Sequence, residues 1–123
     1  MLFRSRTAMT LRARLMENLL EAGSDTELRR ELYLCGLFSQ LDLLLGEPLA
    51  VALHRLPIAE RIHSAGVTGR GAYLPYLAVA RAIESGDSGL VSRRCHQHGM
   101  KRGHANRALL RTLGQMHGAT IKL

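Results

Sequence analysis

Residues 28–56 constrain the fold more than any other part of this 123-residue chain. They read LRRELYLCGLFSQLDLLLGEPLAVALHRL, which is apolar for most of its length. Gly36, Ser39 and Asp42 recur within this stretch at steps of three, and residues three apart share one face of a helix. The spacing therefore predicts a narrow stripe of small or polar side chains along a leucine-rich helix.

Two members of this stripe need a structural reason. A glycine inside a helix costs about 1 kcal/mol relative to alanine, so we expect another helix to approach Gly36 closely. Asp42 lies among leucines and would be costly to bury without hydrogen-bond donors, so we expect the following turn to supply them. In that turn, Gly46 suits a helix C-terminus and Pro48 suits the first turn of the next helix.

Apolar spacing predicts helices throughout the chain, without a β-alternating run of useful length or an internal repeat. Ser24 and Glu27 form a capping-box pattern for a long helix that ends near Leu45. Pro48 and Pro57 each open a short helix, and VTGRG at residues 67–71 is the clearest loop. The other predicted helices cover residues 11–20, 72–85, 90–98 and 104–117. The residues expected to face inward in the second and fourth of these are Leu74, Leu77, Ala78, Ala82 and Ile83, then Ala108, Leu109, Thr112, Leu113 and Met116.

Length and composition predict one all-α, compact, multi-helix domain over residues 1–123. The chain has a common domain size, and its 46% hydrophobic content with no Trp predicts an aliphatic core. No window approaches the ~18 unbroken apolar residues of a membrane span, and the N-terminus lacks the apolar segment of a secretory signal. The two cysteines, Cys35 and Cys95, are too few for a disulfide framework, so we expect a reducing cytoplasm.

The run from Gly36 to Ile62 resembles the C-terminal half of an HDOD domain, the HD-related output domain of bacterial signalling proteins. The family pattern is similar to Gly36-Leu37, Ser39, Leu41-Asp42, Leu44-Leu45-Gly46, Pro48, Leu56-Pro57 and Glu84-Ser85-Gly86-Asp87 in this chain. Residues 12–17, RARLME, resemble the preceding helix in the HDOD domains that are fused to an EAL domain. The best match covers residues 10–87, and a weaker one covers residues 88–118.

This resemblance implies an HD-like helical fold and a non-catalytic regulatory role by protein–protein contact, linked to cyclic di-GMP signalling. It also implies a binding partner, which is either a separate protein or an N-terminal domain. That domain would be the N-terminal half of an HDOD domain or an EAL domain, and neither pattern occurs in this sequence. A complete HDOD domain has further helices N-terminal to the matched residues. Without them, part of the aliphatic surface is expected to be uncovered and to promote partner docking or self-association.

The motifs for chemistry are mostly missing, so we expect neither catalysis nor a cofactor. No His-Asp dipeptide, EAL motif, P-loop or nucleophile elbow occurs in the sequence. Cys95, His98 and His104 are the best candidate zinc ligands, but they lack a second spaced pair and lie near basic residues, so we expect no metal. Cys35 among leucines is expected to be inert, and Arg70 in its glycine-flanked loop is expected to lie on an ordinary surface.

Positive charge is concentrated at the C-terminal end. Residues 1–89 hold ten Arg and ten acidic residues, whereas residues 90–123 hold five Arg, two Lys and no acidic residue, and so carry the whole net charge of +7. Such asymmetry marks either a solvated basic helix pair or a surface for an anionic partner. The candidate basic contact surface is Arg93, Arg94, Lys101, Arg102, Arg107 and Arg111. A small helix-turn-helix DNA-binding protein is therefore the alternative function, ranked second.

Overall fold

The computed structural model is all-helical and describes residues 2–20, 26–54, 56–57, 60–63 and 71–116. Its helices are α1 (Leu2–Leu19), α2 (Thr26–Phe38), α3 (Leu41–Leu45), α4 (Leu49–His54), α5 (Glu60–His63), α6 (Leu74–Ser85), α7 (Ser88–Gln97) and α8 (Arg102–Met116). No strand occurs within these ranges. The all-α prediction is confirmed.

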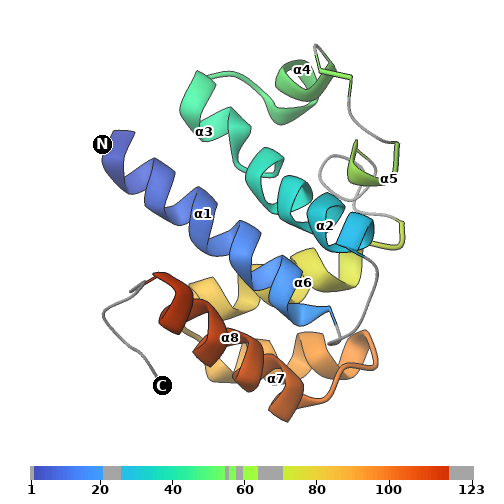
Figure 1. Ribbon diagram of the computed structural model, residues 1–123. Coiled ribbons are helices and arrows are strands. Elements are labelled where there is room, and N and C mark those ends of the chain that lie inside the picture. The colour runs from blue at the N-terminus through green and yellow to red at the C-terminus, as the bar shows by residue number, and fades with distance from the viewer. Residues whose placement is uncertain (1, 21–25, 55, 58–59, 64–70, 117–123) are drawn as a thin grey trace.

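The first helix is the centre of the arrangement. Helix α1 contacts α2, α6 and α8 along its length and also meets α3, so it lies between the two ends of the molecule (Figure 1). Helices α3 and α4 contact each other at one end, whereas α7 and α8 lie at the other. This division separates the motif-bearing segment from the basic C-terminal helices.

The core around α1 is aliphatic, as the composition predicts. The largest fully buried side chains of α1 are Leu15, Met16 and Leu19, and they pack into one cluster with residues of α2, α6, α7 and α8. Helices α7 and α8 contribute mainly small side chains to it, namely Val91, Cys95, Ala105 and Ala108. Small residues let the helix backbones approach, so little aromatic volume is needed to fill the core.

The predicted long helix to Leu45 is wrong, because the chain bends at Ser39 and Gln40 between α2 and α3. The Ser39 hydroxyl donates to the carbonyl oxygen of Gly36 at 2.9 Å, and the Gln40 amide donates to the Leu37 carbonyl at 3.4 Å. Such side-chain bonds to the helix backbone compete with the regular i to i−4 pattern. Gln40 leaves the helical region at φ −119°, and the helix restarts at Leu41.

The other helix predictions are close at their boundaries but less accurate in their faces. Helices α6, α7 and α8 correspond to three predicted helices, and α1 extends further back, to Leu2. In α6, Val79 and Ala80 are buried although neither was expected inside, because α6 is packed against α1, α2 and α7 on several sides. In α8, Leu113 is 42% exposed, so its expected inward position is wrong.

The short-helix predictions are confirmed in part. Helix α4 follows Pro48, and α5 lies within the region predicted after Pro57. The capping residue Ser24 and residues 67–70 of the VTGRG loop lie outside the described part of the chain. Among the described residues, no helix combines the length and the apolar character needed to cross a membrane.

Candidate functional site

Gly36 lies at a close contact between α1 and α2, as expected from its place in the sequence. A Cβ at this position would lie 2.6 Å from the Cα of Ala13 and 2.8 Å from its backbone nitrogen. Ala13 is itself fully buried. Only a residue without a side chain lets these two helix backbones meet at this distance. The packing of the two helices offsets the free-energy cost of a glycine inside a helix.

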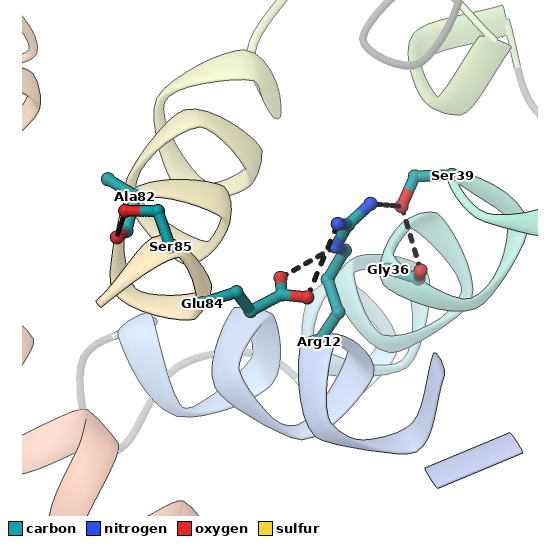
Figure 2. Close-up of polar contacts among 6 residues, drawn as sticks. All are labelled: Arg12, Gly36, Ser39, Ala82, Glu84 and Ser85. Atoms are coloured by element: carbon teal, nitrogen blue, oxygen red, sulfur yellow. Dashed lines mark hydrogen bonds and ion pairs between the residues drawn. The ribbon is translucent and has the colours of Figure 1, made fainter. Parts of the chain in front are cut away.

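Arg12, next to Ala13, joins α1 to α6 and to the turn that follows α2 (Figure 2). The Arg12 guanidinium on α1 donates from Nε to Oε2 of Glu84 at 2.7 Å and from Nη2 to Oε1 at 3.3 Å, a two-point ion pair with α6. Its Nη1 donates to Oγ of Ser39 at 3.0 Å, and that hydroxyl donates in turn to the Gly36 carbonyl. We name Arg12, Ser39 and Glu84 the polar junction.

Charge at the polar junction is largely shielded from water. The Arg12 and Glu84 side chains are 14% and 17% exposed. Arg81, one turn before Glu84, has its pKa lowered by burial first and by the nearby Arg12 charge second, while Glu84 and then Asp42 act in the opposite direction. The carboxylates thus balance two neighbouring guanidinium groups. The ion pair thus joins α1 to α6 in a region shielded from water.

Segment 84–87 has a structural role at each position. Glu84 completes the polar junction, and the Ser85 hydroxyl donates to the Ala82 carbonyl at 2.6 Å. Gly86 ends α6 in the left-handed conformation at φ +75°. Asp87 then caps α7 by accepting the Leu90 amide at 3.1 Å. The run that resembles the family pattern therefore ends one helix, starts the next and binds α6 to α1.

The rest of the expected motif serves the α3–α4 turn. Asp42 is half-buried in the first turn of α3, and the bond that the turn makes to it joins the Gly46 amide to its backbone oxygen at 2.9 Å. This bond does not involve the carboxylate, so the expectation that the turn supplies donors to the Asp42 side chain is not met among the described residues. Gly46 adopts φ +68°, while Pro48 and Pro57 are exposed beside short helices.

The cysteines are buried and weakly acidic. Burial raises the pKa of the Cys35 thiol to about 11, although Arg81 and Arg12 act to lower it. Burial also raises the pKa of Cys95, which Arg102 opposes. A nucleophilic or metal-binding cysteine needs its thiolate, so both environments favour a packing role.

The candidate zinc ligands do not converge. Cys95 is buried, and Nε2 of His104 lies 2.5 Å from the Leu19 carbonyl oxygen at the end of α1. Within the described ranges, no three His, Cys, Asp or Glu side chains are placed to hold a metal ion. A structural zinc site needs four such ligands.

The candidate basic surface divides into engaged and exposed side chains. Arg102 donates to the Ser88 carbonyl, Oγ of Ser92 and Oδ1 of Asn106, and Arg94 donates to Oε1 of Gln97. Arg102 thereby links α8 to α7, whereas the Arg94 bond lies within α7. The residues left exposed to solvent are Arg93, Lys101, Arg107 and Arg111, so the structure gathers a smaller basic surface than the sequence indicates.

Sequence reasoning missed the pairings that hold this region together. Arg12 and Glu84 are 72 residues apart, and no local pattern couples positions so distant. Asn18 donates to Oγ1 of Thr112 at 2.9 Å across 94 residues. An Asn inside the apolar spacing of α1 was the available signal, because a buried amide requires a partner.

This chain was compared with family models, curated proteins and solved structures. No protein-family model, no curated protein and no solved structure matches this chain. The class that its fold and candidate site define is therefore an all-α protein with a polar junction between α1, α6 and the turn that follows α2.

Proposed function

We propose that this chain is a non-catalytic, cytoplasmic module of bacterial signal transduction that acts by protein–protein contact alongside cyclic di-GMP signalling proteins. The sequence resemblance to HDOD domains suggests this role. In support, the residues that carry the resemblance hold helices together at the polar junction and at segment 84–87.

Exposed apolar side chains on α3, on α4 and just after α4 carry the proposal. Leu45 is 51% exposed, Val51 is 46% exposed and Leu56 is 36% exposed. Helix α4 packs mainly on α3, at the end of the molecule away from α8. Large apolar side chains exposed within twelve residues of one another along the chain support a protein contact site in this part of the molecule. We name Leu45, Val51 and Leu56 the α3–α4 apolar surface.

Site-specific crosslinking tests the proposal directly. A photoreactive amino acid at Val51 should capture one defined protein in cells, whereas the same group at the exposed Arg93 on α7 should not. The captured protein, once purified, should change its synthesis or hydrolysis of cyclic di-GMP when the intact chain is added. V51D should abolish that change without unfolding the chain, because the side chain is already half exposed.

Four outcomes would contradict the proposal. Equal capture from positions 51 and 93 would show that the α3–α4 apolar surface has no particular affinity. Capture of a second copy of the chain would make the surface a homo-oligomer interface. Hydrolysis of cyclic di-GMP by the isolated chain, or a stoichiometric tightly held metal in elemental analysis, would overturn the non-catalytic assignment.

DNA binding is the second candidate, favoured by one observation. Arg107 and Arg111 are exposed one turn apart on α8, the second helix of a helix pair. Against it, Leu110 is 68% exposed and Leu113 is also exposed on the same helix. Leucine side chains cannot form hydrogen bonds or ion pairs with the phosphates of a DNA duplex. We therefore rank protein contact above DNA binding.

A further inference from the structure

A hollow of about 670 Å³ shares no lining residue with the α3–α4 apolar surface. It is lined by the C-terminal end of α1, the start of α6, the α7–α8 turn and the first two turns of α8. This volume falls within the roughly 300–1,000 Å³ of small-molecule pockets. The hollow is therefore large enough for more than a simple ion.

The polar lining of the hollow is cationic. Lys101 and Arg107 supply this charge, His98 and His104 add ring nitrogens, and none of the lining residues that the structure describes is an Asp or a Glu. Residues 88–116, which include all of α7 and α8, contain no acidic side chain to neutralise them. Positive charge gathered in a concave site raises the local concentration of anions.

Two of these side chains are placed by neighbouring atoms. Nε2 of His104 meets the Leu19 carbonyl oxygen at 2.5 Å, and since a carbonyl only accepts, Nε2 is the donor and Nδ1 is the remaining polar atom. Nη1 of Arg107 lies 3.4 Å from the point where a Cβ on Gly103 would be. The guanidinium therefore lies back along α8 toward its N-terminus, where Lys101 and His104 also are.

The helix starts add to the same field. Tyr73 is the N-cap of α6, and Lys101 directly precedes α8, whose His104 and Ala105 amides bond to the Lys101 carbonyl. The N-terminal end of a helix carries partial positive charge. Because the ends of both α6 and α8 border the hollow, they reinforce the side-chain cations.

The rest of the lining is apolar and includes one aromatic ring. Tyr76 and Pro75 from α6 line the same hollow as Leu20, directly after α1, and Met100 from the α7–α8 turn. An aromatic ring in such a setting offers a stacking surface to a planar group. The cationic and apolar parts together suit a ligand that joins a phosphate to a flat ring.

We propose that this hollow binds a nucleoside phosphate. Lys101 and Arg107 bind the phosphate oxygens, and Tyr76 packs against the base. The proposal goes beyond the protein-contact function, since it assigns a small-molecule site on helices that do not form the α3–α4 apolar surface.

Calorimetric titration of the intact chain tests this assignment with AMP, inorganic phosphate and adenosine as separate probes. AMP should bind at least tenfold more tightly than either fragment, because only AMP engages both parts of the lining. R107Q and K101Q should each weaken AMP binding about tenfold, as expected for loss of a charge-assisted hydrogen bond. R111Q is the matched control, since Arg111 is an exposed arginine one turn further along α8 that does not line the hollow. It should weaken binding less than about threefold, through screened long-range charge alone.

Y76L separates the two halves of the site. It should weaken AMP binding and leave phosphate binding unchanged, and circular dichroism would verify that the variant is folded. Equal loss in R107Q and R111Q would mean diffuse attraction to the basic helices and would overturn the proposal. So would AMP binding no tighter than phosphate, absence of AMP binding in the millimolar range, or displacement of AMP by duplex DNA at equal phosphate concentration.

Discussion

The backbones of Gly36 and Ala13 are so close that a Cβ on residue 36 would lie 2.6 Å from the Cα of residue 13. G36A should therefore force α1 and α2 apart and destabilise the protein by about 1–3 kcal/mol, as overpacking does. G36L should destabilise it further. Urea unfolding measures both effects, and stability equal to that of the wild type would contradict the close contact.

G114A is the matched control for this prediction. Gly114 also lies inside a helix, but a Cβ there would meet nothing within 4 Å. The substitution should stabilise the protein by about 0.5–1 kcal/mol, because alanine favours the helix. If G36A lowers the free energy of unfolding while G114A raises it, the effect at position 36 comes from packing and not from helix propensity.

The Arg12–Glu84 ion pair should contribute more to stability than an ordinary surface pair. E84Q removes the carboxylate charge and leaves the largely buried Arg12 guanidinium without its counter-ion, so we expect a loss of about 2–3 kcal/mol. E17Q breaks the pair with Arg14, whose side chain is 42% exposed, and should cost less than about 1 kcal/mol. Chemical denaturation of the two variants compares them, and equal losses would mean that the polar junction has no special weight.

The buried amide of Asn18 gives a third stability prediction. T112V keeps the shape of the side chain but removes the hydroxyl that accepts from Asn18 and donates to the Ala108 carbonyl. The loss should be about 1–2 kcal/mol, moderated because Asn18 also donates to Oε1 of Gln115. Thermal unfolding would reveal it. The double variant N18L/T112V should recover part of the stability, since an apolar pair leaves no unsatisfied donor.

Local chemistry in the sequence predicts the parts of this fold that depend on neighbours in the chain. Gly86 and Asp87 mark the junction between α6 and α7, and the lone glycine at position 36 marks a close helix contact. The break after Phe38 escaped prediction because leucines continue through it, while the cause is the Ser39 hydroxyl bond to Gly36. That hydroxyl is itself held by Arg12, 27 residues away.

Pairings across the tertiary structure could not be predicted in the same way. Glu84 is recognisable as an acid before a turn, but its partner Arg12 is one of ten arginines in residues 1–89. The cationic hollow likewise joins residues of α1, α6 and α8 that no spacing rule connects. The apolar spacing of α8 predicts that Leu113 is buried, but the side chain is exposed. The buried face of this helix is the stripe of Ala105, Ala108 and Thr112.

Cys35 gives a prediction at high pH. Its pKa of about 11 in the folded protein exceeds its ordinary value of 9.0, so the folded state holds the thiol proton where the unfolded state releases it. Stability from this group is complete below about pH 9 and is lost as the pH rises through 11. Between about pH 8 and pH 11 the wild type should lose roughly 2 kcal/mol more than C35A. Urea unfolding of both proteins at several pH values checks this, and parallel pH profiles would contradict it.

The basic surface of α8 distinguishes a docking module from a DNA reader. Arg107 and Arg111 are exposed on α8, and a net charge of +7 attracts any polyanion at low salt. A DNA reader would bind one duplex with a dissociation constant of about 10⁻⁸ M or tighter near physiological salt, and R107A would remove its preference for that sequence. We expect instead weak binding without sequence preference that disappears as salt is raised. R107A and R111A should reduce it equally, because each removes one phosphate contact. Mobility-shift titrations against random and genomic duplexes measure this, and a strong preference for one duplex would favour the regulator.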